Sequence, residues 1–256
     1  MNNVVRTHVQ ERVLVITLDR PQARNAVNGA LARGLEAAVD ELESTDELWA
    51  GVLTGEGPVF SAGADLKAVA AGEQEELRTE RGGFAGFVQR ERTKPLVAAL
   101  QGDAVAGGME IAIACDLIIA AAGARMGLPE ASRSLLATGG GLVRLPKLIG
   151  EKAALELAMT GTPQSVEHLA GLGLVSRVVP AEEVSQRALE LAERICSNAP
   201  LAVRAARQVI LRGGDSDEQQ RWQFAERELA RIAETNDFAE GPRAFVAKRR
   251  PQWTGT

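Results

Sequence analysis

Alternating apolar and polar positions predict a β-hairpin near the start of the chain. Residues 4–9 and 12–18 both have the pattern of strands, and the second strand is apolar on both faces. A helix is expected next, because Asn28 is a suitable N-cap and apolar residues recur at helical spacing as far as about Ser44. The chain therefore begins with paired strands followed by an amphipathic helix.

Short apolar runs then alternate with small-residue turns and helices up to about residue 130. The runs that have the length of buried strands are 50–54, 96–101, 117–120 and 125–128. Residues 68–94 are charged and interrupted by glycine, which indicates weak helices and a mobile flap. Because strand, turn and helix repeat about three times, we expect an α/β fold built from strand–strand–helix turns.

Beyond Gly150 the pattern is almost wholly helical. Helices are expected at about 151–159, 165–171, 181–197, 201–212 and 217–235, and only residues 175–179 look like a strand. We therefore divide the chain into residues 1–190, which form the core and contain the candidate site, and residues 191–256, which form a helical C-terminal region.

Charge and composition exclude several kinds of partner. The net charge is −5, so no overall positive field attracts nucleic acid or an anionic membrane. No apolar run approaches the ~18 residues of a membrane span, and residues 1–6 lack the apolar stretch of a signal peptide. His8 and His168 belong to no metal-ligand or Ser/His/Asp spacing. We expect a cytoplasmic protein without a bound metal.

Two glycine-rich turns, residues 62–65 and 106–110, each follow a strand and begin a helix. The N–H groups at a helix N-terminus lack partners within the helix and can hold an oxyanion. Small residues in the same places also permit tight turns and close packing, which is the alternative interpretation of either turn alone. A third glycine run, residues 139–141, lacks the Lys-Ser/Thr of a phosphate-binding loop.

Glu110 is the strongest candidate for acid/base chemistry. It lies three residues after Gly107 and precedes an apolar stretch, so its carboxyl group enters a hydrophobic environment beside the expected oxyanion site. Burial raises the pKa of a carboxyl group toward neutrality, which suits proton transfer. Glu130 alone is a loop carboxylate, and its candidacy depends on pairing with Glu110, so that one group activates water while the other delivers a proton.

The order and spacing of several motifs resemble the enoyl-CoA hydratase/isomerase (crotonase) family over nearly the whole chain. No single motif is decisive, but together they are highly specific. They are Ile16-Thr17-Leu18-Asp19-Arg20-Pro21, Phe60-Ser61-Ala62-Gly63-Ala64-Asp65-Leu66-Lys67, Ala106-Gly107-Gly108-Met109-Glu110, Gly127-Leu128-Pro129-Glu130 and the closing Ala244-Phe245 and Lys248-Arg249.

The resemblance implies a spiral of ββα turns with a helical C-terminal trimerisation region, assembled as a homotrimer or a hexamer. It implies an enoyl-CoA hydratase that binds an acyl-CoA thioester and needs no cofactor, since coenzyme A is part of the substrate. By this resemblance, the N–H groups of Ala64 and Gly107 form the oxyanion hole, and Glu110 and Glu130 are the catalytic pair. Residues matching the coenzyme A cleft are Arg24, Ala26, Ala62, Asp65 and Leu66, and Lys248 matches a cation near the phosphates.

One departure from the family pattern concerns the turn at Ala137-Thr138. Many hydratases have Pro-Gly there, and the N–H of that glycine helps to hold the water. Thr138 keeps an N–H, but its β-branched side chain restricts the backbone. The alternatives are another reaction of the family, either double-bond isomerisation or the dehydration of a carnitinyl-CoA-like substrate, and a non-catalytic acyl-CoA binding protein.

Overall fold

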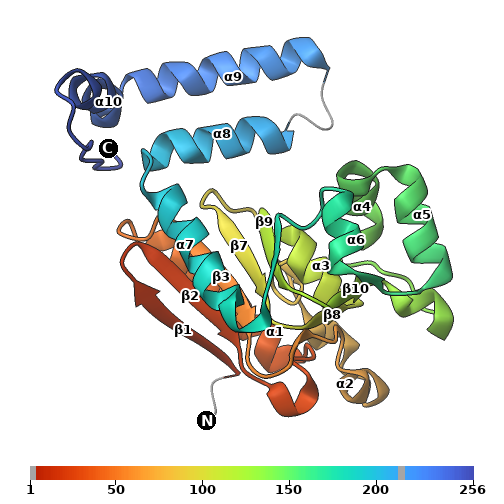
Figure 1. The fold of residues 1–256 in the computed structure, drawn as a ribbon. Coiled ribbons are helices and arrows are strands. Elements are labelled where there is room, and N and C mark those ends of the chain that lie inside the picture. Colours follow the sequence, from red (N-terminus) through yellow and green to blue (C-terminus); the bar gives the residue numbers. More distant parts are fainter. Residues whose placement is uncertain (1–3, 213–216) are drawn as a thin grey trace.

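The computed structural model describes residues 4–212 and 217–256, so the expectation about the first three residues lies outside it. Two sheets form the core (Figure 1). The larger has the order β1 (Val5–Gln10), β2 (Val13–Leu18), β3 (Ala50–Gly55), β7 (Leu96–Leu100), β9 (Leu117–Ala121) and β12 (Arg177–Val179). The smaller has the order β11 (Gln164–Ser165), β10 (Arg125–Gly127), β8 (Asp103–Val105) and β4 (Val59–Ser61).

In three pairs of consecutive strands, β3/β4, β7/β8 and β9/β10, the two strands go to different sheets, and this produces stacked ββα turns. β3 is followed by β4 and then α2 (Leu66–Ala70), and β7 by β8 and then α3 (Gly107–Ala114). The next turn has β9, β10 and the 3-10 helix η3 (Pro129–Arg133). Because β3, β7 and β9 pair in parallel, as do β4, β8 and β10, each turn lies on the previous one. The α/β fold and the repeated turns expected from the sequence are confirmed.

Two amphipathic helices cover the larger sheet. In α1 (Gly29–Ser44) the Asn28 side chain accepts a hydrogen bond from the Leu31 N–H at 3.0 Å, and the apolar stripe of the helix is buried. The second helix, α7 (Val184–Cys196), follows the 3-10 helix η4 (Ala181–Glu183) and contacts β2, β3, β7 and β9. The N-cap and the apolar spacing predicted from the sequence thus fix α1 against the strands.

The segment between α2 and β7 is less helical than expected. It contains only the 3-10 helix η2 (Gln74–Leu77) and a hairpin of β5 (Arg78–Thr79) and β6 (Gly83–Phe84). Apolar side chains anchor it, since Leu77, Phe87 and Val88 are all at most 3% exposed. We keep the name flap for residues 78–90 of the segment 68–94, and its mobility stays a prediction.

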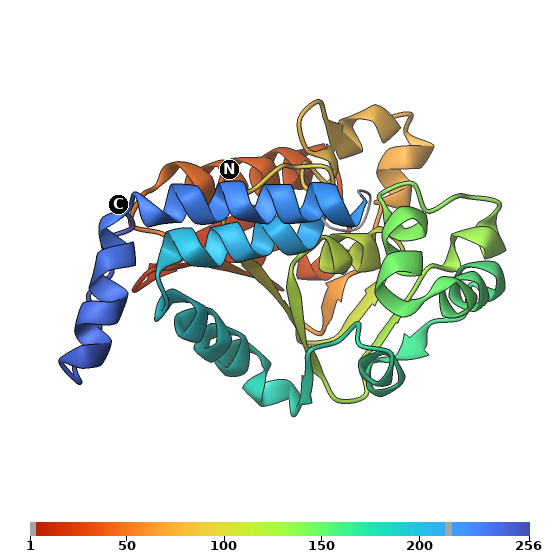
Figure 2. The same cartoon turned by 90° about the horizontal axis from the view of Figure 1, so that it is seen from above.

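The C-terminal half contains helices that the sequence analysis missed. A helical lobe consists of α4 (Gly141–Ile149), α5 (Glu151–Thr160) and α6 (Val166–Gly171), of which α4 was not expected because it begins with glycine and contains Pro146. A helical arm consists of α8 (Pro200–Arg212), α9 (Glu218–Ala233) and the unexpected α10 (Asn236–Val246). Figures 1 and 2 show α8 and α9 side by side, with α10 at the end of the pair where α8 begins and α9 finishes. No helix in residues 4–212 and 217–256 is long and apolar enough to cross a membrane.

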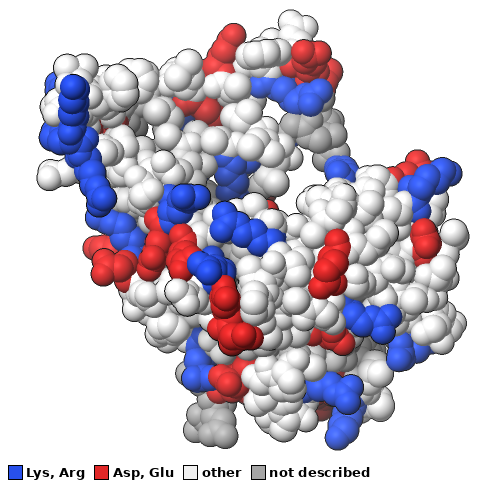
Figure 3. Space-filling view, in the orientation of Figure 1, with Lys and Arg blue, Asp and Glu red and all other residues white. Residues whose placement is uncertain are grey.

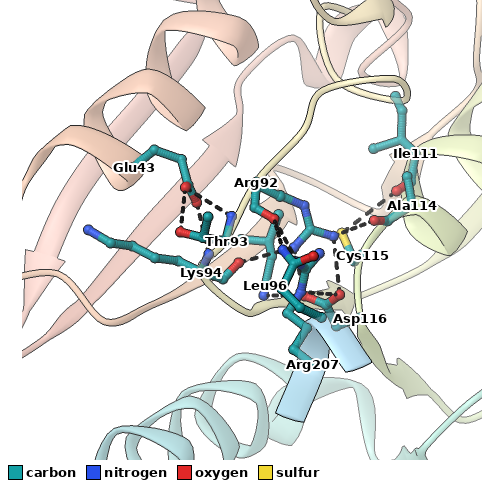
Figure 4. Close-up of polar contacts among 11 residues, drawn as sticks. Glu43, Arg92, Thr93, Lys94, Leu96, Ile111, Ala114, Cys115, Asp116 and Arg207 are labelled. Carbon is teal, nitrogen blue, oxygen red and sulfur yellow. Dashed lines mark hydrogen bonds and ion pairs between the residues drawn. The ribbon is translucent and has the colours of Figure 1, made fainter. Parts of the chain in front are cut away.

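A buried charge cluster ties the arm to the core (Figure 4). Asp116 precedes β9 and accepts hydrogen bonds from Arg92 at 2.6 Å and from Arg207 of α8 at 2.8 Å. Arg92 also donates to the carbonyl of Ala114 at the end of α3. The same cluster therefore holds the C-terminal end of α3 and the start of the arm.

Candidate active site

The two glycine-rich turns lie against each other. A Cβ placed on Gly63 would approach the nitrogen of Gly107 to 2.6 Å, and one on Gly107 would meet the Phe84 ring at 2.4 Å. Only glycine at these positions allows this approach, and Phe84 of the flap covers Gly107. The pairing of the two turns that the sequence suggested is therefore present in the fold.

The backbone of each turn leaves a donor for a ligand. Val27 bridges Ala64 in parallel fashion: its N–H donates to the carbonyl of Gly63, and its carbonyl accepts from Asp65. In such a bridge the N–H of Ala64 points away from the partner strand. Gly107 is the first residue of α3, where a helix provides no acceptor for an N–H. These two donors suit an oxyanion, although their role as an oxyanion hole stays a prediction.

Glu110 lies in the first turn of α3 and is 3% exposed. Its Oε1 accepts a hydrogen bond from the N–H of Gly141 at 2.9 Å. Because Gly141 is the first residue of α4, the carboxylate lies at the positive end of that helix. Glu110 therefore joins the N-terminal turns of two helices.

Three consecutive glycines, Gly139, Gly140 and Gly141, form the wall around this carboxylate, and we call them the glycine turn. A Cβ on Gly139 would lie 2.4 Å from Oε2 of Glu110, and one on Gly141 would lie 3.1 Å from Oε1. The sequence analysis tested this run only as a phosphate loop and missed its contact with Glu110. The sequence feature that could have revealed this contact is the run of three glycines downstream of Glu110, since small residues leave room for a carboxyl group.

Glu130 faces the same region from η3. Burial raises the pKa of Glu110 to about 7, and the negative charge of Glu130 adds to the rise, while the amides of the glycine turn oppose it. Burial also raises the pKa of Glu130, whose Oε2 is buried without a hydrogen-bond partner among the described residues. A carboxyl group that titrates near neutral pH beside a second one of raised pKa is suited to acid/base catalysis.

The residues assigned to the coenzyme A cleft are partly brought together. The N–H of Ala62 donates to the carbonyl of Arg24 at 3.0 Å, so the segment that holds Ala26 runs beside the turn. Leu66, at the start of α2, is 53% exposed. Asp65 has structural partners, because it caps α2 through Lys67 and pairs with Arg20 at 3.0 Å.

Two further residues of that prediction lie in different surroundings. Thr138 is exposed and directly precedes Gly139, so its backbone lies beside the glutamate pair. Lys248 follows α10, and Figures 1 and 2 show α10 and α2 at opposite ends of the molecule. Within one chain the structure therefore does not bring Lys248 to the other candidate residues.

Stacked ββα turns that hold a buried and a half-buried carboxyl group beside free backbone donors define a crotonase-type protein. The family model described as enoyl-CoA hydratase/isomerase matches residues 8–256. The chain belongs to this family, as the sequence motifs indicated.

Solved structures and curated relatives agree on the family and differ in the reaction that they name. The crystal structure of an enoyl-CoA hydratase from Mycobacterium tuberculosis H37Rv is 42% identical, with a TM-score of 0.96 and full coverage of both chains. A carnitinyl-CoA hydratase structure from Mycobacterium avium is 40% identical, with a TM-score of 0.78 and full coverage of both chains. A carnitinyl-CoA dehydratase from Salmonella typhi is 36% identical over 249 residues, covering 95% of each chain. The crotonase fold is thereby confirmed, and the chain is an enzyme of this family.

Proposed function

We propose that the protein is an enoyl-CoA hydratase that adds water reversibly, in syn fashion, across the 2,3-double bond of a 2-enoyl-CoA to give a 3-hydroxyacyl-CoA. The observation that carries this proposal is a pair of carboxyl groups with raised pKa values, the buried Glu110 and the half-buried Glu130. A hydratase needs two such groups, because a water proton must be removed and another proton must be delivered to C2. An isomerase can work with one.

The surroundings of the two carboxyl groups suggest different roles. Glu110 accepts the N–H of Gly141 at 2.9 Å, which favours its charged form as a base that holds the water. Burial raises the pKa of Glu130, whose Oε2 has no donor among the described residues, and we assign to this group the proton delivered to C2. As water attacks C3, negative charge develops on the thioester oxygen. The N–H groups of Ala64 and Gly107 would stabilise this charge by ~3–4 kcal/mol per donor.

The acyl group is proposed to be aliphatic. The segment between η3 and α4 and the first turn of α4 expose large aliphatic side chains beside the glutamate pair; they are Leu135 (51% exposed), Leu136 (68%), Leu142 (37%) and Val143 (70%). Aromatic cages are the typical means of recognising a quaternary ammonium group, and none of these four exposed side chains is aromatic. An uncharged enoyl chain therefore fits this wall better.

Hydration can be followed by the loss of conjugated enoyl-thioester absorbance with crotonyl-CoA and longer homologues. Glu110→Gln and Glu130→Gln should each lower the rate by roughly 10²–10⁴. Glu151→Gln, at an exposed carboxylate at the start of α5, is the matched control and should leave the rate unchanged. No hydration of any chain length by a protein that still binds CoA thioesters, with no solvent deuterium entering C2, would instead support a non-catalytic binding protein.

The second candidate reaction is the dehydration of a carnitinyl-CoA-like substrate. It is favoured by the similarity to proteins named carnitinyl-CoA dehydratase. Rates with crotonyl-CoA should be compared with rates for a 2-enoyl-CoA that bears a quaternary ammonium group. A preference for the cationic substrate would establish the dehydratase and reject the aliphatic acyl group.

We also propose a homotrimer or a pair of trimers, located in the cytoplasm. The arm leaves large apolar side chains uncovered; they are Ile210, Leu211, Trp222, Leu229, Phe238, Phe245 and Val246. A neighbouring subunit would cover such surfaces and could bring its Lys248 toward the phosphates of coenzyme A. Light scattering should give three or six times the chain mass of 27.1 kDa.

A further inference from the structure

Arg144, in the first turns of α4, contacts the glycine turn that holds Glu110. The backbone N–H of Arg144 donates to the carbonyl of Gly140 at 2.9 Å. A Cβ on Gly140 would lie 1.9 Å from Nη1 of Arg144, whereas the corresponding positions on Gly139 and Gly141 would meet Glu110. The turn therefore contacts the guanidinium group and the carboxylate at successive residues.

The charge of Arg144 acts on Glu110 without a direct ion pair. Arg144 opposes the rise in the pKa of Glu110, and Glu110 in turn favours the charged form of Arg144. No ion pair within 4.0 Å joins Arg144 to a carboxylate in the part of the chain that the structure describes. A direct ion pair between Arg144 and Glu110 would hold Glu110 in its charged form. A cation held near but out of contact leaves the carboxyl group able to take up a proton.

Arg144 also links the glycine turn to the flap. Its Nη2 donates to the carbonyl of Val88. Val88 is joined in turn to Phe84 by a backbone hydrogen bond of 3.2 Å, and the Phe84 ring covers Gly107. One side chain thus connects the wall around Glu110 with the segment that covers the proposed oxyanion donors.

We propose that Arg144 is a positioning residue for Glu110. Through its packing on Gly140 and its hydrogen bond to Val88 it fixes the glycine turn, and its guanidinium group supplies a positive charge close to the carboxylate without contacting it. Burial lowers the pKa of Arg144, and the positive charge of Arg92, which is paired with Asp116 (Figure 4), lowers it further. The catalytic part of this inference rests on the proposed hydratase activity.

The test compares two substitutions. Arg144→Gln removes the positive charge. Arg144→Lys keeps the charge but loses the planar guanidinium group that contacts both Gly140 and Val88. Lys147→Gln removes a positive charge from the exposed side of the same helix and is the matched control. Infrared difference spectra between each protein and its Glu110→Gln counterpart isolate the carboxyl group of Glu110 and give its titration midpoint without substrate. Steady-state kinetics with the best enoyl-CoA substrate give kcat and KM.

In Arg144→Gln the midpoint should rise by about one pH unit, and kcat should fall about 10- to 100-fold with little change in KM. In Arg144→Lys the titration midpoint should equal the wild-type value, whereas kcat should be as low as in Arg144→Gln. The proposal is overturned if either quantity is unchanged in Arg144→Gln, or if Lys147→Gln shifts the midpoint equally. A wild-type protein without hydratase activity would refute only the proposed function, because the infrared titration needs no substrate.

Discussion

Glu110→Gln is expected to slow hydration by roughly 10²–10⁴ and at the same time to stabilise the folded protein above neutral pH. Burial raises the pKa of Glu110 from its ordinary value of 4.5 to about 7. Between these values the folded protein holds the proton while the unfolded chain releases it, so raising the pH favours unfolding. The cost is absent below pH ~4.5 and complete above pH ~7.

The size of this effect follows from the same two values. Each pH unit between them corresponds to about 1.36 kcal/mol, so the full cost at pH 8 is roughly 3.4 kcal/mol. At pH 5 only roughly 0.8 kcal/mol is expressed, which leaves a change of about 2.5 kcal/mol between pH 5 and pH 8. Because Glu110 is 3% exposed, water does little to reduce the penalty. Glutamine remains uncharged and does not incur it.

The assay is urea unfolding of wild type and Glu110→Gln at several pH values and one fixed protein concentration, followed by tryptophan fluorescence. The glutamine side chain can still accept the N–H of Gly141 through its oxygen, while its NH₂ group faces the rest of the glycine turn. Any cost of that mismatch does not depend on pH and cancels when two pH values are compared. A difference in unfolding free energy that is the same at pH 5 and pH 8 would refute the raised pKa and the acid/base role derived from it.

Three other substitutions test particular contacts. Gly139→Ala places a methyl group 2.4 Å from Oε2 of Glu110. The kcat for hydration should therefore fall by about 100-fold, while the melting temperature changes little. An unchanged kcat would contradict the close contact between the glycine turn and Glu110. Lys94→Met removes the buried amine that donates to two carbonyls at the end of α1, at 2.7 and 2.6 Å. Urea unfolding should show a loss of about 1–3 kcal/mol, and equal stability would show that water replaces the amine. Asp116→Asn leaves the buried Arg92 and the half-buried Arg207 of α8 without their carboxylate. It should cost about 3–5 kcal/mol and speed amide hydrogen exchange in α8, whereas wild-type exchange would show that this cluster does not hold the arm.

Much of the fold could be predicted because local signals and burial agree. Asn28 caps α1 and the apolar stripe behind it is buried, so the predicted helix to Ser44 has the observed end. Both missed helices contain a proline, although Thr235 caps α10. α4 starts from Gly140 without a side-chain cap and contains Pro146, and α10 contains Pro242. Their positions depend on packing partners distant in the chain, which periodicity does not report.

The candidate site shows the same division between local and long-range information. Glu110 could be proposed from its own surroundings, since Gly107 and the apolar stretch of α3 adjoin it in sequence. Its hydrogen bond from Gly141 spans 31 residues, and nothing in the local sequence distinguishes a glycine turn that surrounds a carboxylate from one that only bends the chain. What resolves the ambiguity is steric: at Gly139 even a methyl group would displace the carboxylate. The glycines thus provide room for a carboxyl group that must be buried, held by backbone N–H groups and still free to exchange a proton.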